Sequence, residues 1–170
     1  MESSKKRPHI VLVGFMGSGK STVGPLLASR LGLPFVDLDD EIEKAQRRSI
    51  EQIFSSSGEV AFRQIERRAL RKALARETTV LALGGGAFQS ERNREAVQQG
   101  GVSVWLKASL DVARSRSDDS DRPLARDPSL FDTLYHQRLS TYQLADLHVE
   151  VESLTPDQVA ETVLNLLERS

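Results

Sequence analysis

Short apolar runs alternate with longer amphipathic segments along the chain. Five runs are rich in apolar and β-branched residues and have the length of buried strands, and they lie at residues 10–13, 34–38, 79–83, 102–106 and 147–151. The segments between them carry helix-like patterns. Short strands that alternate with helices are typical of a parallel sheet covered on both faces. The pattern therefore predicts an α/β fold with three layers, α/β/α, around a five-stranded parallel sheet.

Residues that cap helices stand where the helical segments are expected to begin. Ser49 and Thr155 are each followed by glutamine three residues later, which is the spacing of a capping box. Further N-cap candidates are Ser90, Ser109 and Asp127, the last followed by a proline that suits the first helical position. These start signals agree with the alternation of strands and helices.

The composition is that of a globular protein and limits the classes of partner. The 170 residues suit one domain, which we expect over residues 9–170 after a polar N-terminal tail of residues 1–8. The 23 basic and 24 acidic residues nearly cancel, so the charge does not indicate nucleic-acid binding. No apolar run approaches the roughly 20 residues that span a membrane, and there is no cysteine for a disulfide. We therefore expect a cytoplasmic protein without a nucleic-acid or membrane partner.

A phosphate-binding loop follows the first predicted strand. Residues 14–21 read Gly-Phe-Met-Gly-Ser-Gly-Lys-Ser and match the pattern Gly-x-x-x-x-Gly-Lys-[Ser/Thr]. The glycines allow the backbone to curl and to direct its N–H groups at a phosphate, beside the N-terminus of a helix expected over residues 23–31. Lys20 can reach the β- and γ-phosphates, and the Ser21 hydroxyl can contact Mg²⁺. The motif predicts that the chain binds a nucleotide.

Two carboxylates close the second predicted strand, at the edge where parallel sheets bind ligands. Asp37 and Asp39 are two residues apart, so in a strand their side chains would point the same way. One can hold Mg²⁺ through its water shell, and the other can orient a hydroxyl that attacks the γ-phosphate. In the alternative interpretation, Asp39 and Asp40 only cap a helix that begins at Glu41.

A triple glycine and an arginine mark a second candidate site. The glycines at residues 84–86 follow the third predicted strand, where the absence of side chains lets a small ligand approach the backbone. Arg63 lies in a helix expected to open at Gly58, next to apolar residues that allow its head to turn inward. Glu66, three residues later, can hold Arg63 in an ion pair.

Residues 114–127 contain almost no apolar side chain. They predict a surface loop, and two interpretations of it stay open. The loop is either a solvated connection or a lid that closes on phosphates, and Arg122 and Arg126 favour the lid.

In this order and spacing, the motifs resemble the shikimate kinase family, small-molecule kinases of the nucleoside-monophosphate-kinase-like P-loop class. The resemblance runs from Ile10 to about Val151. The motifs that carry it lie at residues 14–22, 37–39, 58–66, 84–87, 122–124 and 138–146. The resemblance implies a P-loop NTPase fold with a mobile lid. It also implies transfer of the ATP γ-phosphate to the 3-hydroxyl of shikimate, a step of aromatic amino-acid biosynthesis.

The resemblance further implies roles for individual residues. Lys20, Asp39 and Arg122 would be catalytic, and Ser21 and Asp37 would hold one Mg²⁺ per nucleotide. The ATP site would consist of Gly17, Ser18, Gly19, Lys20, Ser21, Thr22 and Arg122. The shikimate site would consist of Asp39, Arg63, Gly84, Gly85, Gly86 and Arg138. Asp39 would face the ring hydroxyls and the two arginines the carboxylate, whereas Arg114 and Arg116 are equal candidates for the adenine side.

Two other functions are compatible with the fold. One is a different small-molecule kinase, such as a gluconate or nucleotide kinase, and the other is a catalytically silent P-loop binding module. A nucleotide acceptor would need groups for a second base and phosphate, whereas the acceptor residues here suit a compact acid. We expect a monomer. The histidines His9, His136 and His148 lack metal-ligand spacing, so we expect them to be structural or solvated. Trp105 lies in the fourth predicted strand beside apolar residues, and we expect it in the core.

Overall fold

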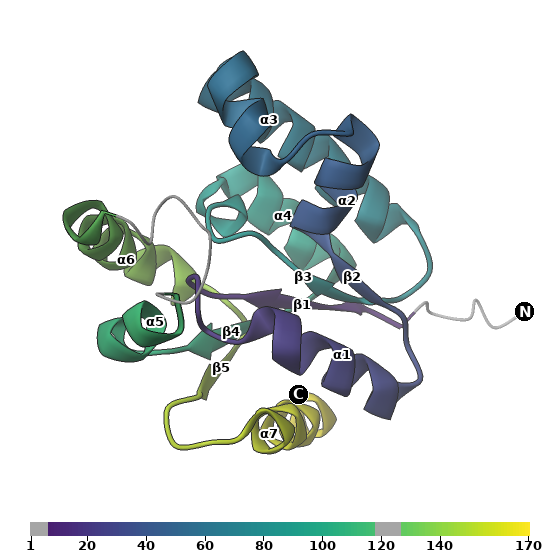
Figure 1. Ribbon diagram of the computed structural model, residues 1–170. Coiled ribbons are helices and arrows are strands. Elements are labelled where there is room, and N and C mark those ends of the chain that lie inside the picture. The colour runs from purple at the N-terminus through teal and green to yellow at the C-terminus, as the bar shows by residue number, and fades with distance from the viewer. Residues whose placement is uncertain (1–6, 118–126) are drawn as a thin grey trace, which may run out of the picture.

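A single parallel sheet organises the chain. The computed structural model describes residues 7–117 and 127–170. The five strands of the sheet are β1 His9–Val13, β2 Phe35–Asp37, β3 Val80–Ala82, β4 Gly101–Lys107 and β5 Leu147–Glu150. They lie side by side in the order β2-β3-β1-β4-β5, and all pairs are parallel (Figure 1). All five predicted strands are confirmed, with ends that differ by at most one residue.

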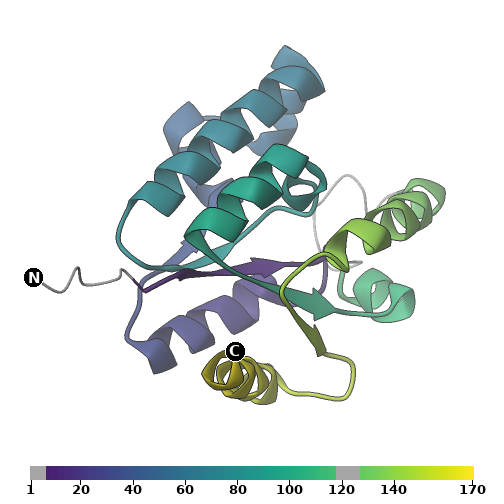
Figure 2. The same ribbon diagram turned by 180° about the vertical axis from the view of Figure 1, so that it is seen from behind.

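Helices cover both faces of this sheet, as predicted. They are α1 Lys20–Leu31, α2 Leu38–Gln46, α3 Ile50–Ala75, α4 Glu91–Gly100, α5 Leu110–Ser117, α6 Pro128–Tyr142 and α7 Pro156–Arg169, with a short 3₁₀ helix η1 at Ala87–Gln89. In opposite views, α2, α3 and α4 lie on one side of the sheet, and α1 and α7 lie on the other (Figure 1 and Figure 2). The described part of the chain contains no helix that is long and apolar enough to cross a membrane.

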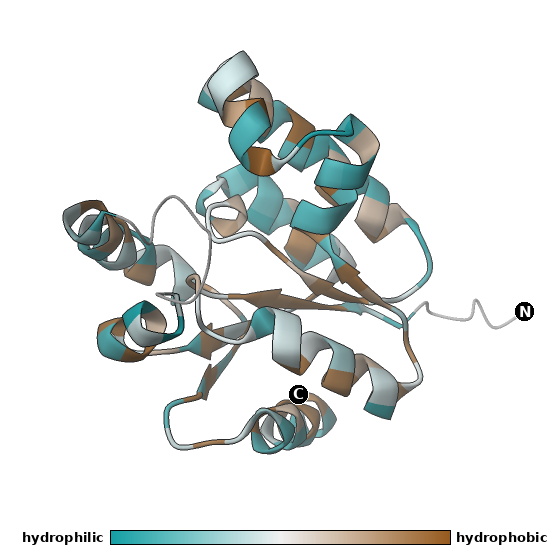
Figure 3. Ribbon diagram, viewed as in Figure 1, coloured by the Kyte–Doolittle hydropathy of each residue, from teal (hydrophilic) through white to brown (hydrophobic). Residues whose placement is uncertain are grey.

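Successive side chains of the central strand β1 point to opposite faces of the sheet, and each face has its own hydrophobic core. Val11 and Val13 pack with α2, α3 and α4, while Ile10 and Leu12 pack with α1 and α7. All four side chains are buried, because a parallel strand under helices is covered on both faces. The strands accordingly form a continuous hydrophobic layer between the more polar helices (Figure 3). Trp105 on β4 is buried in the core, as expected.

The predicted caps begin the helices. Ser49 and Thr155 each form a complete capping box with the glutamine three residues later. Ser90 accepts a hydrogen bond from the backbone of α4, and Asp127 accepts one from the backbone of α6. In α3 the helix expected to open at Gly58 is a second segment, because Gly58 has non-helical torsions (φ 82°, ψ 172°) that interrupt the longer helix.

Two sequence expectations are wrong in part. Asp39 does not continue strand β2, because the chain turns into α2 directly after Asp37 and Asp39 lies in the first helical turn. The cap of α2 is therefore Asp37, and the alternative cap at Asp39 or Asp40 is also wrong.

The loop expected over residues 114–127 is too long, since its first four residues belong to α5 and its last residue caps α6. The remainder, with Arg122 and Arg126, lies outside the described residues.

The topology brings the candidate motifs to one edge. The phosphate-binding loop follows β1, Asp37 ends β2, and the triple glycine follows β3. These three strands are neighbours in the order β2-β3-β1. Their carboxyl ends consequently place the loop, the carboxylates and the glycines together.

Candidate active site

The phosphate-binding loop is built on backbone conformations that favour glycine. Gly14, Gly17 and Gly19 have φ values of 152°, 81° and 98°. Gly19 directly precedes α1, so the first turn of this helix presents its N–H groups at the loop. Lys20 curls over the loop, and its Nζ donates to the backbone carbonyls of Gly14 at 2.5 Å and Phe15 at 3.2 Å. The lysine ammonium is thus held at the place where phosphates of a nucleotide would bind.

A pocket of about 350 Å³ opens in front of this loop. It is lined by Lys20, Ser21, Asp37 and Asp39, together with loop residues and the first two glycines of the triplet. Predicted phosphate and metal residues therefore share one cavity with Asp39, Gly84 and Gly85 of the predicted acceptor site, even though they come from three different strand ends. Gly17, Gly19 and Thr22 also line it, whereas the side chain of Ser18 is buried beneath the loop.

Asp37 combines a structural role with a free oxygen. Its Oδ1 accepts hydrogen bonds from the N–H groups of Asp39 at 3.0 Å and Asp40 at 3.2 Å. Its Oδ2 accepts none from any described residue. Burial raises the pKa of the Asp37 carboxyl above its ordinary value, although the two N–H groups and Lys20 oppose this shift. The half-buried carboxylate gains stabilisation from a bound cation, because a positive charge favours its ionised form.

The triple glycine makes room for three charged side chains. A Cβ on Gly84 would lie 2.6 Å from Oδ1 of Asp39, and one on Gly85 would lie 2.9 Å from Nη1 of Arg138. A Cβ on Gly86 would lie 2.5 Å from Nη2 of Arg63. Real Cβ atoms essentially never approach other atoms within 3.0 Å. Each glycine therefore admits one predicted acceptor-binding side chain against the backbone.

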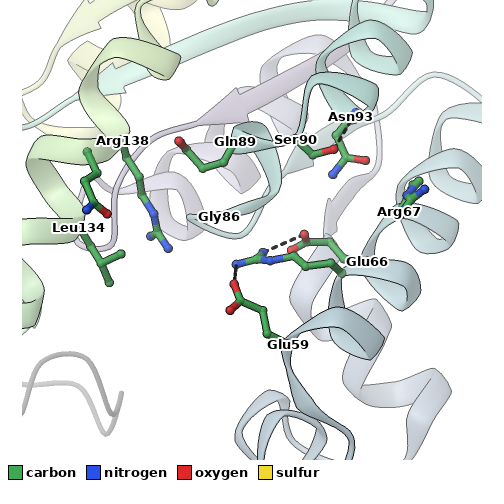
Figure 4. Close-up of a pocket in the computed structure, with 11 residues that line it drawn as sticks. Glu59, Glu66, Arg67, Gly86, Gln89, Ser90, Asn93, Leu134 and Arg138 are labelled. Carbon is green, nitrogen blue, oxygen red and sulfur yellow. Dashed lines mark hydrogen bonds and ion pairs between the residues drawn. The ribbon is translucent and has the colours of Figure 1, made fainter.

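Arg63 is fixed by two glutamates on its own helix. Its Nη1 donates to Glu66 at 2.9 Å, and Nη2 lies 3.7 Å from Glu59 (Figure 4). The predicted pair with Glu66 is thereby confirmed. The Glu66 side chain is only 2% exposed, and burial raises its pKa although the Arg63 charge opposes the shift. A buried carboxylate that is paired in this way holds the guanidinium in one orientation.

Arg138 approaches the same place from α6, on the opposite side of the triplet. Its guanidinium lies over the ring of Phe15, 5.5 Å from the centroid, and is half-buried. Burial lowers the pKa of Arg138, which nevertheless stays charged because its ordinary value is so high. Arg63, Arg138 and Gly86 line a second cavity of about 360 Å³ (Figure 4). Two guanidinium groups beside a narrow glycine backbone can bind a carboxylate in a bidentate manner.

The arginines of α5 are separated by their contacts. Arg116 is exposed and donates to the backbone carbonyl of Gly17 at 3.3 Å, so it lies on the phosphate-binding loop. Arg114 forms an ion pair with Asp132 of α6 instead. The geometry favours Arg116 for a contact on the nucleotide side. Arg122 lies outside the described residues, so its place at the phosphates stays a prediction.

The sequence interpretation assigned no role to one residue beside the site. Tyr142 donates its hydroxyl hydrogen to the carbonyl of Gly85 at 2.5 Å. The sequence does contain a signal that Tyr142 lies beside the site, because it follows Arg138 by four residues and residues at this spacing share one face of a helix. The histidines behave as expected for structural or solvated residues: His9 and His148 bond to backbone carbonyls, and His136 is exposed.

Fold and site together define a P-loop phosphotransferase with a small, acidic acceptor. A profile of the family described as "Shikimate kinase" matches residues 16–168. A shikimate kinase of Rhizobium leguminosarum is 42% identical to this chain, and the match covers 94% of this chain and 83% of that protein. A shikimate kinase of Sulfurihydrogenibium is 38% identical, and the match covers 95% of this chain and 98% of that protein. The structure of "Shikimate kinase from Acinetobacter baumannii in complex with shikimate" has a TM-score of 0.90 and 36% identity, and it covers 96% of this chain and 94% of that one. The chain belongs to the shikimate kinase family.

Proposed function

We propose that this protein transfers the γ-phosphate of ATP to the 3-hydroxyl of shikimate and forms ADP and shikimate 3-phosphate. The observation that carries the proposal is the triple glycine, which seats Asp39, Arg63 and Arg138 against one backbone segment beside the phosphate-binding loop. One carboxylate and two guanidinium groups match a ligand with ring hydroxyls and one carboxylate. Family membership favours this function over the gluconate kinase, nucleotide kinase and silent-module alternatives.

In the proposed reaction the 3-hydroxyl oxygen bonds to the γ-phosphorus while the bond from this phosphorus to the bridging oxygen of ADP breaks. The hydroxyl proton passes to the Asp39 carboxylate or to water. Lys20 stabilises the charge that develops on the transferred group, and Asp39 orients the attacking oxygen. Arg63 and Arg138 hold the carboxylate of shikimate and so fix the ring for in-line attack.

The donor set also suits a single Mg²⁺ carried by the nucleotide. Ser21 and Asp37 line the nucleotide pocket, and Asp37 has an oxygen that no described residue uses. Mg²⁺ takes few protein ligands and keeps several waters, so a hydroxyl and a carboxylate suffice beside the phosphates. We propose that both residues hold the ion, directly or through water. The ion would neutralise phosphate charge during transfer.

The experiment that tests this function follows ADP formation with each substrate varied. We expect turnover that depends on shikimate, a phosphate monoester in the ³¹P spectrum of the product, and loss of activity with excess chelator. D-gluconate and nucleoside monophosphates serve as competing acceptors. Equal ADP formation without shikimate, or preference for another acceptor, would contradict the proposal, and full activity in chelator would contradict the role of Mg²⁺.

Two further properties stay predictions for this chain. We propose a monomeric enzyme that acts in the cytoplasm. Its mass in solution by sedimentation equilibrium tests the first, and fractionation of the source cells tests the second.

A further inference from the structure

Tyr142 joins the two sides of the acceptor pocket. Its Oη donates to the carbonyl of Gly85 at 2.5 Å. The guanidinium of Arg138 lies against the same glycine, since Nη1 of Arg138 and Oη of Tyr142 lie 2.9 Å and 3.8 Å from the place that a Cβ on Gly85 would take. The Tyr142 hydroxyl therefore holds the glycine against which the α6 arginine lies.

The bond to Gly85 also fixes the next N–H group. Carbonyl and N–H of a trans peptide point in opposite directions, and the described chain has no cis peptide bond. Since the Gly85 carbonyl points at Tyr142, the N–H of Gly86 points away from it. This N–H makes no hydrogen bond to any described residue, which leaves it available to a ligand oxygen. Rotation of this peptide would turn the carbonyl toward the ligand and replace a donor with an acceptor.

The tyrosine itself is held rigidly. It is 1% exposed, and its ring stacks on Trp105 with centroids 5.9 Å apart and an angle of 30° between the rings. Trp105 contacts the ring of His148 edge-on at 5.2 Å, so the stack is anchored in β4 and β5. Burial raises the pKa of Tyr142 to about 12, although the charge of Arg138 opposes the shift. The hydroxyl is consequently protonated, and able to donate to Gly85, across the physiological pH range.

We propose that Tyr142 is a positioning residue of the acceptor site, which orients Arg138 and the Gly85–Gly86 peptide for shikimate without contacting it. The proposal rests on the function proposed above. Its energetic basis is that Arg138 and the glycine peptide are already in their binding orientation before the acceptor arrives. Without the hydroxyl, binding would have to order both groups, and the cost would appear in the affinity for the acceptor.

Tyr142→Phe tests this role because it removes one oxygen and keeps the stacked ring. We expect the KM for shikimate to rise roughly fivefold to twentyfold, the effect of losing the buried hydrogen bond that fixes the Gly85 carbonyl. The KM for ATP and kcat should stay within about twofold, because a defect confined to ground-state binding of one substrate raises only its KM. Trp105 is the only tryptophan, so its fluorescence can report shikimate binding directly in both proteins.

Tyr135 provides a matched control on the same helix. It is also buried, and its hydroxyl donates to the carbonyl of Ala108 at 2.7 Å, away from the triple glycine. Tyr135→Phe should cost similar thermal stability and leave the KM for shikimate unchanged. An unchanged KM in Tyr142→Phe, or equal rises in both variants, would overturn the proposal. Absence of shikimate-dependent turnover in the unmodified protein would instead refute the proposed function.

Discussion

Glycines differ between the two halves of the active site, because the three in the phosphate-binding loop have positive φ and those of the triple glycine do not. In the phosphate-binding loop they supply backbone conformations, and Gly19 shows this most clearly. Its φ is 98°, yet a Cβ placed on it would meet nothing closer than 3.7 Å. In the acceptor half they supply space. Gly86 has an ordinary φ of −99°, but a Cβ on it would lie 2.5 Å from Arg63.

The difference shows how each half binds its ligand. The nucleotide half uses N–H groups of the backbone, whose directions depend on left-handed torsions that other residues rarely adopt. The acceptor half uses charged side chains that must lie against the backbone. Substitutions should therefore separate the two substrates, since strain in the loop affects ATP and crowding at the triplet affects shikimate.

The largest expected effect belongs to the nucleotide half. Lys20→Ala should lower kcat by about 10²–10³, the typical loss when one preorganised donor to developing charge is removed. Shikimate binding without nucleotide should be unchanged, because Lys20 donates to the carbonyls of Gly14 and Phe15 in the phosphate-binding loop, away from Arg63 and Arg138. Steady-state kinetics and a shikimate titration measure both. A near-normal kcat would show that Lys20 is not at the transferred phosphate.

An intermediate effect is expected in the acceptor half. Arg63→Lys keeps the charge but loses the planar fork, so shikimate binding should weaken by roughly 1.5–3 kcal/mol. The KM for ATP should barely change. Arg67→Lys is the matched control, one turn further along α3, because Arg67 lines the same cavity and forms no ion pair with any described residue. Equal losses for both substrates would mean that Arg63 is structural.

The smallest effect is expected for Arg116, at the edge of the nucleotide half of the site. Arg116→Ala should raise the KM for ATP less than about fivefold, because the side chain is exposed and solvent screens its charge. The KM for shikimate should not change. Arg114→Ala is the comparison, and its loss of the pair with Asp132 should affect thermal stability more than either KM. A larger ATP effect for Arg114 would reverse the assignment drawn from the contacts.

The sequence was sufficient for the sheet and for the phosphate-binding loop because both depend on local patterns. Apolar runs predicted all five strands, and the spacing of glycines with Lys20 predicted the loop before α1. The secondary structure around the carboxylates of Asp37 and Asp39 was predicted less accurately. A strand interpretation of residues 37–39 relied on period-two alternation, but the carboxylate of Asp37 caps the following N–H groups and starts a helix at once.

Contacts between segments far apart in the chain could not be predicted from the sequence. The pairing of each glycine with one side chain joins β3 to α2, α3 and α6, and no local pattern encodes these approaches. The bond from Tyr142 to Gly85 spans 57 residues. Arg116 could not be distinguished from Arg114 for the same reason, since their difference arises from where α5 packs relative to the loop and α6.

The most direct test of the account is a titration of nucleotide-free protein with shikimate and with ADP, for Gly19→Ala and Gly86→Ala in parallel. Circular dichroism confirms that each variant is folded. Gly86→Ala should weaken shikimate binding about tenfold to a hundredfold through displacement of Arg63 and leave ADP binding unchanged. Gly19→Ala should do the reverse, because strain at a positive φ costs roughly 1–3 kcal/mol in the loop. If both variants weakened both ligands equally, the two halves would not be separate, and the account would be wrong.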